Sequence, residues 1–196
     1  MSDSTSTSTR TDPGSADDRV VLVDEQGAPI GSELKTRVHT ADTPLHLAFS
    51  VYLFDGAGNV LMTRRALAKL TWPGVWTNSC CGHQRLHEPA ADGVHRRTAT
   101  ELGLRIEDLR CALPDFRYRA EDAGGVVENE ICPVFVGTVE DVAELRPDPA
   151  EVMEWAWVPW RQLRSAVSGA PFAFSPWCVS QIRALQHAQD HRLQVG

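Results

Sequence analysis

The sequence has no long hydrophobic segment and no regular cysteine pattern. No apolar run approaches ~18 residues, the length that a membrane-crossing helix needs, and no charged-then-apolar leader opens the chain. The five cysteines are an odd number and include no C-x-x-C pair, which argues against a disulfide framework or a zinc ribbon. Each cysteine is therefore expected first as a small buried residue. We expect a cytoplasmic protein that has no membrane partner.

The start of the chain also lacks the material for a folded core. Residues 2–18 are mostly Ser, Thr, Asp, Gly and Arg without a bulky apolar side chain, so burial cannot offset the entropy of ordering them. The whole chain is 42% hydrophobic and has six Trp and six Phe, which suffices for a sizeable core. We predict a disordered tail over residues 1–19 and a single folded domain over residues 20–192.

A surplus of positive charge is absent as well. The net charge of -7 argues against nucleic acid as a partner. Basic side chains nevertheless cluster locally, at Arg64, Arg65 and Lys69, at Arg96 and Arg97, and at Arg117 and Arg119. A basic pocket in an acidic protein suits a small anionic ligand, although any one of these residues could equally belong to a solvated face. No obligatory protein partner is evident.

Hydrophobic periodicity predicts an α/β (α+β) fold. Strands are expected over residues 20–23, 45–54, 60–63, 75–81, 116–119, 126–136 and 154–158, with a hairpin between the second and third. Helices are expected over residues 89–102, 159–167 and 176–192, and Gly103 stands where a C-terminal glycine ends the first of them. Strands interleaved with a few helices, in no repeat, indicate a layered mixed domain.

Strand geometry separates two adjacent cysteines. If residues 77–83 are extended, Cys81 and His83 point to one side of the strand and Cys80 points to the other. Only Cys81 can therefore share a site with His83, and Cys80 is expected to pack in the core.

By the same geometry, Glu128 and Glu130 lie on one face of a strand that borders apolar residues. Two neighbouring buried acids repel, so one stays protonated or both bind a cation. The alternative is an edge strand whose acids face solvent. With His39, His46 and His83 these acids could supply nitrogen and oxygen ligands to Mn²⁺ or Mg²⁺, with Zn²⁺ as a further candidate. Each histidine alone could equally be a satisfied surface residue.

The segment from Cys81 to Leu104 follows a diphosphate-processing signature. Its spacing matches the Nudix pattern G-x5-E-x7-R-E-U-x-E-E-x-G-U, where U is a bulky aliphatic residue, at Gly82, Glu88, Arg96, Glu101, Gly103 and Leu104. Two acids of the pattern are missing, because Arg97 and Thr100 stand in their places. Arg97 and Glu101 lie one helical turn apart and can face one ligand, although an exposed salt bridge is the alternative.

Longer blocks extend the likeness over roughly residues 20–185. They are the segments 39–50, 63–67, 72–79, 81–83, 114–120, 127–130 and 174–177, including Trp72-Pro73-Gly74 and Val127-Glu128-Asn129-Glu130. At these residues the chain closely resembles type 1 isopentenyl-diphosphate isomerases. The resemblance implies a Nudix-fold catalytic domain over residues 20–192, with a mixed β-sheet sandwiched by helices. It also implies interconversion of isopentenyl and dimethylallyl diphosphate, a small-molecule C5 substrate.

The resemblance also implies a role for individual residues. The divalent-metal ligands would be His39, His46, His83, Glu128 and Glu130, and Glu101 would hold a Mg²⁺ that binds with the diphosphate. Cys81 and Glu130 would transfer the two protons, and either could donate. Tyr118 and Trp177 would line the pocket, and the diphosphate would contact Lys35, Arg65, Lys69 and Arg97.

Two other functions remain open at this point. A Nudix pyrophosphohydrolase would need a cluster of acids around Mg²⁺ on the helix, and Arg97 and Thr100 remove two of them. A non-catalytic module that binds a diphosphate or a metal would need neither proton-transfer residue.

Overall fold

The computed structural model describes residues 18–194, with side chains up to residue 188. The tail predicted over residues 1–19 therefore lies almost wholly outside the described residues. Within residues 18–194, none of the helices combines the length and the apolar character that crossing a membrane requires.

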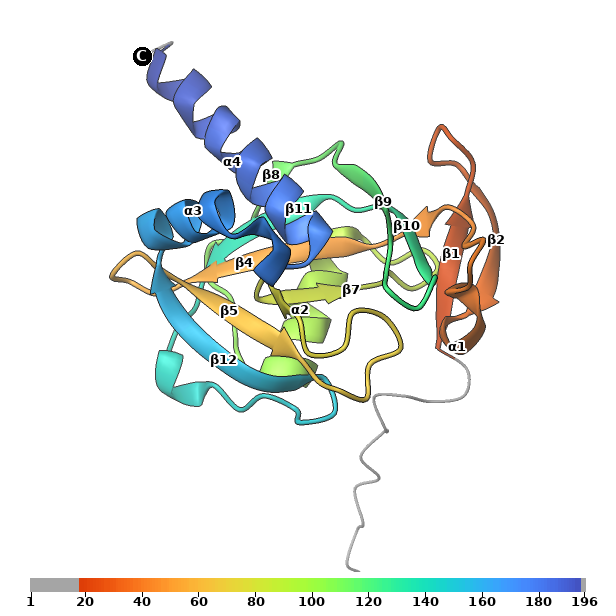
Figure 1. Cartoon of the computed structure of the whole chain (residues 1–196), viewed down its shortest axis with the longest axis horizontal. Helices are drawn as coiled ribbons and strands as arrows, with labels where there is room; N and C mark the ends of the chain where they lie inside the picture. The colour runs from red at the N-terminus through yellow and green to blue at the C-terminus, as the bar shows by residue number, and fades with distance from the viewer. Residues whose placement is uncertain (1–17, 195–196) are drawn as a thin grey trace, which may run out of the picture.

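A seven-stranded sheet forms the centre of the structure (Figure 1). Five strands follow the order β12 (Val152–Pro159), β5 (Asn59–Arg65), β4 (Phe49–Phe54), β11 (Val134–Thr138) and β8 (Arg110–Leu113). In addition, β6 (Trp76–Thr77) pairs with β5, and β7 (Cys80–Gly82) pairs with β4. Strands β4 and β11 are parallel, whereas the other pairs are antiparallel, so the sheet is mixed.

Helices cover both faces of this sheet, as predicted. Helix α2 (Ala90–Leu102) packs on the face that carries Phe49, Val51 and Leu53 of β4. Helices α3 (Trp160–Gly169) and α4 (Pro176–Gln194) pack on the opposite face, in front of the sheet in Figure 1. Because both faces of β4 are buried, the alternation of its residues separates two hydrophobic cores rather than a core from solvent.

A second sheet of five strands lies beside the first. Its order is β2 (Pro29–Leu34), β1 (Arg19–Val23), β3 (His46–Leu47), β10 (Val127–Ile131) and β9 (Arg117–Glu121). A single-turn helix α1 (Lys35–Val38) follows β2, and two short 3₁₀ helices, η1 (Val142–Glu144) and η2 (Pro171–Ala173), flank β12 and α3. The sequence patterns did not predict β2, α1 or β8.

Two long strands of the prediction each cross from one sheet to the other. The predicted strand 45–54 is divided at Ala48 into β3 and β4, and the predicted strand 126–136 is divided at Cys132-Pro133 into β10 and β11. The two segments run parallel and remain bonded through the bends, because Ala48 N–H donates to the Ile131 carbonyl at 3.0 Å and Ser50 N–H donates to the Pro133 carbonyl at 3.1 Å. The predicted strand 75–81 is likewise divided into β6 and β7.

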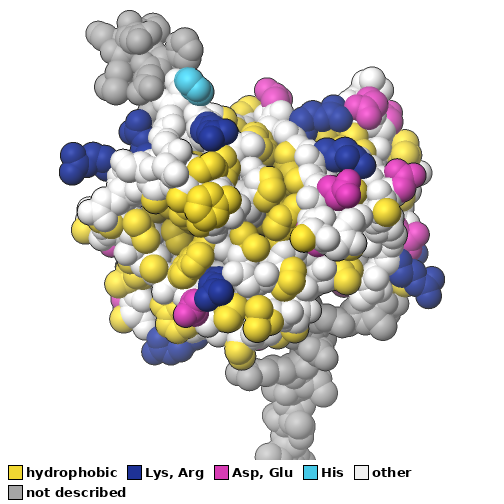
Figure 2. Space-filling view, viewed as in Figure 1, with side chains coloured by type: hydrophobic (Ala, Val, Ile, Leu, Met, Phe, Trp, Pro, Cys, Tyr) yellow, Lys and Arg dark blue, Asp and Glu magenta, His cyan; other side chains and the backbone are white. Residues whose placement is uncertain are grey.

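The surface of the molecule matches these two cores. Figure 2 shows hydrophobic side chains gathered toward the middle of one face, with most charged side chains toward its margin. Histidine appears in that view only at the upper edge, and the imidazole of His46 is fully buried.

Helix α2 ends at Gly103 in the left-handed conformation (φ 69°), as the sequence predicts.

Phe49 packs between two glycines that let α2 approach the sheet closely. A Cβ atom added to Gly82 or to Gly93 would lie 2.8 Å from the Phe49 ring, and one on Gly82 would also lie 2.9 Å from Cγ of Arg97. These distances are shorter than carbon atoms tolerate, so both positions require glycine. The contact holds Arg97 directly above the strand that carries Cys81.

We expect Gly93→Ala to destabilise the fold by about 1–3 kcal/mol through overpacking against Phe49, although alanine favours a helix interior. Gly169→Ala is the matched control, because Gly169 also lies in a helix but has no atom within 4 Å of the added Cβ. Urea unfolding measures both changes. A Gly93→Ala variant as stable as Gly169→Ala would contradict the close packing.

Candidate active site

A cavity of about 550 Å³ lies where the two sheets meet. Its wall contains most of the residues that the sequence singled out: Lys35, His39, Arg65, Lys69, Cys81, His83, Arg97, Tyr118, Glu128, Glu130 and Trp177. Two further predicted residues, His46 and Glu101, are buried directly behind this wall. The volume falls within the ~300–1,000 Å³ that small-molecule sites occupy.

Three histidines converge on the two strand glutamates. His46 lies in β3 at the position that pairs with Glu130 of the parallel strand β10. His39 follows α1, and His83 directly follows β7. The imidazole rings of the three histidines lie 5.1–5.6 Å apart between centroids. Segments that are distant in the sequence therefore meet as the prediction required.

The distances within this cluster are short. Nε2 of His39 lies 3.0 Å from Oε2 of Glu128, and Nε2 of His46 and His83 lie 3.5 and 3.3 Å from Oε1 of Glu130. One ligand atom from each of His39, His46, His83 and Glu130 lies within 4.8 Å of all the others. Glu128 and Glu130 are 5% and 6% exposed in the interior strand β10, so the alternative of a solvent-facing edge strand is wrong.

The electrostatics of the cluster favour metal ligands. Burial lowers the pKa of His83 to about 4, which leaves this imidazole neutral with a lone pair. Burial opposes ionisation of Glu130, but His46 and His83 outweigh it and hold the pKa of the carboxyl well below its usual range. Burial also lowers the pKa of His46, yet the Glu130 carboxylate reverses the balance and raises it. A charged carboxylate in the interior requires such partners.

The residues present fit a divalent ion. Nδ1 of His46 lies 2.9 Å from the Pro44 carbonyl, to which it donates as N–H, so in the neutral imidazole the lone pair is on Nε2. Nε2 of all three histidines and Oε2 of Glu128 are buried and, despite the short distances given above, make no hydrogen bond of acceptable geometry among the described residues. Buried polar atoms that face one another without hydrogen bonds are expected where an ion belongs. The mixed nitrogen and oxygen set suits Mn²⁺, Mg²⁺ or Zn²⁺.

Strand parity separates the two cysteines as predicted. Cys80 lies on the α2 face and packs in the hydrophobic core, while its thiol donates to Glu101 at 3.3 Å. Cys81 lies on the opposite face, where it pairs with Ser50 of β4 and lines the cavity. Burial and then the nearby Glu130 raise the pKa of the Cys81 thiol, so it is protonated at neutral pH.

Four basic side chains also line the cavity, those of Lys35, Arg65, Lys69 and Arg97. Lys69 pairs with Glu151, Arg97 pairs with Glu101 and lies 3.4 Å from Glu151, and Lys35 lies 3.5 Å from Asp18. Arg97 and Glu101 are 5% and 6% exposed, so the alternative of an exposed salt bridge is wrong. Burial and the charges of Arg97 and Lys69 lower the pKa of Lys35. An anion at this end of the cavity would relieve that repulsion.

Two aromatic side chains, those of Tyr118 and Trp177, also line the cavity. Trp177, at the start of α4, is 2% exposed, and its ring lies 5.6 Å from Tyr118 and 5.2 Å from Trp72 between centroids. The guanidinium carbon of Arg65 lies 5.5 Å from the centre of the Trp177 ring, so a cation already occupies the neighbourhood of its π face.

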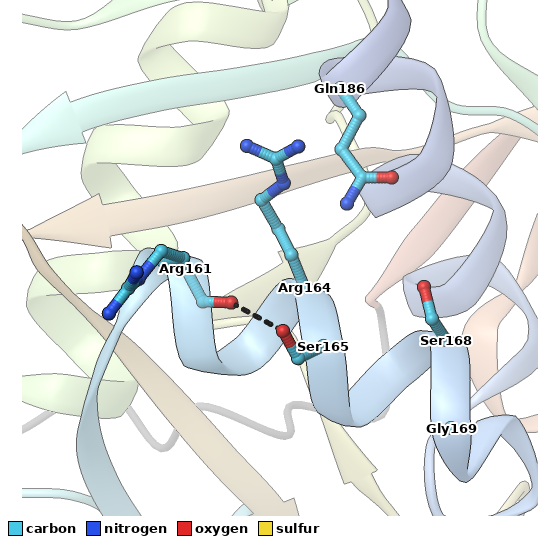
Figure 3. Close-up of a pocket in the computed structure, with 6 residues that line it drawn as sticks. All are labelled: Arg161, Arg164, Ser165, Ser168, Gly169 and Gln186. Atoms are coloured by element: carbon cyan, nitrogen blue, oxygen red, sulfur yellow. Dashed lines mark hydrogen bonds between the residues drawn. The ribbon is translucent and has the colours of Figure 1, made fainter.

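A second, larger hollow lies elsewhere and contains none of the predicted site residues. It is a groove of about 720 Å³ between α3 and α4, lined by Arg161, Arg164, Ser165, Ser168, Gly169 and Gln186 (Figure 3). In this view the side chains of Arg164 and Gln186 extend toward each other across the groove. It has no cluster of metal ligands and no buried acid or thiol.

Three residues of the site had no role in the prediction. Thr71 donates to Glu128 at 2.7 Å and accepts from Arg65 at 3.0 Å, and therefore links the histidine end to the basic end. Glu151 contacts both Lys69 and Arg97 from the segment before β12, where no sequence pattern marked it. Asn78 contacts Cys81 and Trp177, and its place in the block Thr77-Asn78-Ser79 was the only signal.

Known proteins share the fold of this chain, and some share much of its sequence. The chain matches the NUDIX domain family over residues 44–178. A crystal structure from Deinococcus radiodurans superposes with a TM-score of 0.66 at 16% identity, covering 86% of this chain and 99% of that one. A MutT protein from Methanosarcina mazei gives 0.56 at 17% identity, covering 74% and 96%. The chain therefore belongs to the Nudix superfamily, with the mixed sheet between helices that the sequence predicted.

Closer relatives define a narrower family. The chain is 57% identical over 179 residues to the isopentenyl-diphosphate Delta-isomerase of Frankia alni. The match covers 90% of this chain and 91% of the relative. It is 56% identical over 169 residues to the protein of the same name from Mycolicibacterium vanbaalenii, covering 86% and 92%. The chain is a member of the isopentenyl-diphosphate Delta-isomerase family.

We expect Mn²⁺, Mg²⁺ or Zn²⁺ to raise the unfolding temperature of the metal-free protein, because an ion that binds only the folded state stabilises it by mass action. His83→Ala should bind the ion at least about 10-fold more weakly, since outer or inner metal partners contribute 10–100-fold in affinity. Equilibrium dialysis and thermal unfolding measure both effects. His95→Ala is the control, because His95 is exposed on α2. Equal binding by the two variants would place the ion elsewhere.

Proposed function

We propose that this protein interconverts isopentenyl diphosphate and dimethylallyl diphosphate by a 1,3-allylic proton shift in isoprenoid biosynthesis, within one catalytic domain over residues 20–192 in the cytoplasm. Protonation of the terminal alkene carbon gives a tertiary carbocation, and loss of a proton from the carbon on its other side gives the product. The observation that carries the proposal is one cavity whose wall holds a thiol, a buried carboxylate and four basic side chains. The partner is the small C5 diphosphate; neither nucleic acid nor a membrane has a part.

Cys81 and Glu130 are the proposed proton-transfer residues. They lie on β7 and β10, strands of different sheets, and both line the cavity. The raised pKa of Cys81 keeps a proton on the sulfur, and the lowered pKa of Glu130 keeps that carboxyl free to accept one. These protonation states suit a thiol that donates and a carboxylate that accepts in one direction, with the roles exchanged in the reverse reaction.

The aromatic wall is proposed to stabilise the carbocation. The interaction of a cation with the π face of Trp177 contributes about 0.5–2 kcal/mol of stabilisation, and the higher value applies where water is excluded. Tyr118 lies beside this ring, and burial raises the pKa of its hydroxyl well above the usual value, so it stays neutral. A neutral, dry wall offers the carbocation no nucleophile that could trap it.

The basic end is proposed to hold the diphosphate through Lys35, Arg65, Lys69 and Arg97. Glu101 would carry a Mg²⁺ that binds together with the diphosphate. Contacts this far from the reacting carbons position the alkene and contribute binding energy to the proton transfers. Glu151 holds Lys69 and Arg97 in place before substrate enters.

His39, His46, His83, Glu128 and Glu130 are the proposed ligands of Mn²⁺ or Mg²⁺, with Zn²⁺ as a further candidate. A bound ion would fix the Glu130 carboxylate and couple its pKa to the positive charge. The chain itself contributes the orientation of each ligand, through Pro44 for His46 and through Thr71 for Glu128.

The alternative of a Nudix pyrophosphohydrolase is not favoured by α2. Thr100 is exposed and donates to the Arg96 carbonyl at 2.8 Å, so it faces away from the cavity. Arg97 faces the cavity where the hydrolytic pattern has an acid. Glu101 is therefore the only acid that α2 provides beside the basic cluster, among its described residues.

We expect Cys81→Ala and Glu130→Gln each to lower kcat by at least about 10²-fold, the effect of removing a group that transfers a proton. Deuterium incorporation into isopentenyl diphosphate in D₂O measures the proton transfer directly. Cys80→Ala is the matched control and should keep most of the activity, because its thiol faces the opposite side of β7. Full activity in Cys81→Ala would sink the proposed role.

The same measurement separates the alternatives. A hydrolase would release phosphate or pyrophosphate without deuterium incorporation. A binding module would retain the diphosphate and give neither product. Isomerisation with no phosphate release is the result that the proposal requires.

A further inference from the structure

Asn78 joins the two parts of the site that must act together. It lies between β6 and β7, and its side chain is fully buried. Its backbone carbonyl accepts a hydrogen bond from Thr63 at 2.8 Å, which ties this short connection to β5. A buried amide must satisfy both its oxygen and its nitrogen, so its partners define its orientation.

The orientation of the Asn78 amide follows from partners that cannot exchange roles. Nδ2 lies 3.2 and 2.7 Å from the backbone carbonyls of Val51 and Cys80, which only accept. Oδ1 lies 3.2 Å from the indole nitrogen of Trp177, which only donates. The partners of the amide nitrogen and those of the amide oxygen therefore require the same orientation, in which Oδ1 faces Trp177.

The same oxygen accepts from the Cys81 thiol at 3.0 Å. One carbonyl oxygen thus receives the S–H of the proposed proton donor and the N–H of the ring proposed to stabilise the carbocation. The Thr77 hydroxyl, 2.9 Å from this oxygen, has the Ser175 hydroxyl at 2.8 Å as a second partner. Ser50 lies 3.3 Å away from the Cys81 sulfur as its other polar neighbour.

We propose that Asn78 is a positioning residue that fixes the Cys81 sulfur relative to the Trp177 ring. The inference rests on the proposed isomerisation and adds a residue that touches neither the diphosphate nor the metal ligands. Its carbonyl oxygen sets the direction of the S–H bond, and its amide nitrogen anchors that oxygen to β4 and β7. The Cys81 thiol and the Trp177 ring are therefore positioned by the same hydrogen-bond acceptor, Oδ1 of Asn78.

The infrared S–H stretch of Cys81 tests this arrangement. A difference spectrum between the wild-type protein and Cys81→Ala isolates the band of this thiol from those of the other cysteines. In Asn78→Ala the thiol loses its acceptor, so the band should move to higher wavenumber. In Trp177→Phe the oxygen loses a competing donor, so the remaining S–H···O bond should strengthen and the band should move to lower wavenumber.

Kinetics test the consequence. We expect Asn78→Ala to lower kcat by about 10- to 100-fold, the effect of misplacing a reacting group by a fraction of an ångström to 1 Å, with KM changed by less than about threefold because the diphosphate contacts remain. Ser79→Ala is the matched control. Ser79 is equally buried in the same connection, donates to the Leu61 carbonyl at 2.6 Å and accepts from Leu53 N–H at 2.8 Å, but does not contact the thiol.

The outcomes distinguish this inference from the proposed function. If the wild-type protein gives no deuterium incorporation from D₂O, the isomerase proposal fails. If the wild-type protein isomerises but Asn78→Ala keeps its kcat, or loses no more than Ser79→Ala, the positioning role is overturned. If Asn78→Ala does not fold, the Trp177→Phe band decides, and an unshifted band overturns the shared hydrogen bond.

Discussion

The parallel pairing of residues 45–54 with residues 127–138 is the constraint on which the site depends. Both segments leave the five-stranded sheet and enter the seven-stranded sheet at the same level, and backbone hydrogen bonds from Ala48 and Ser50 continue the pairing through the bends. Before the bends this register places His46 beside Glu130. After them, Ser50 pairs with Cys81 on the neighbouring strand β7. His46 and Cys81 are therefore both tied to this set of paired strands.

Acidic and basic side chains from both sheets line the same cavity. The histidines hold the pKa of Glu130 low in the interior, and Lys69 and Arg97 pair with Glu151 and Glu101. Thr71 connects the two ends by contacting both Glu128 and Arg65. Trp177 and Tyr118 add aromatic surface to the same cavity wall. The chain has a net charge of -7, and this cavity gathers Lys35, Arg65, Lys69 and Arg97 beside Asp18, Glu128, Glu130 and Glu151.

Local periodicity predicted those parts of the site that lie within one element. The period of two separated Cys80 from Cys81 and placed Glu128 with Glu130, and Gly103 marked the end of α2. It could not predict the bends at Ala48 and Cys132-Pro133, because apolar residues on both faces of a buried strand continue through them. Glu151 and Asn78 lie in connections, where the side-chain direction is set by tertiary contacts and no repeat exists. The residue types themselves suggested the histidines and glutamates as metal ligands, and the family resemblance implied the same set; their convergence is a tertiary contact that the structure shows.

The departures from the Nudix pattern acquire a physical meaning in this arrangement. A helix that offers several carboxylates to one cavity can gather the cations that activate water against a diphosphate. Here Thr100 faces solvent and Arg97 pairs with Glu101, so α2 contributes one acid that is already neutralised. With Arg97 beside it, Glu101 leaves α2 a single carboxylate for a cation, not the several that the hydrolytic pattern provides. The helix therefore lacks the cluster of acids that a hydrolase would need, and the proposed proton-transfer residues Cys81 and Glu130 lie on other elements, β7 and β10.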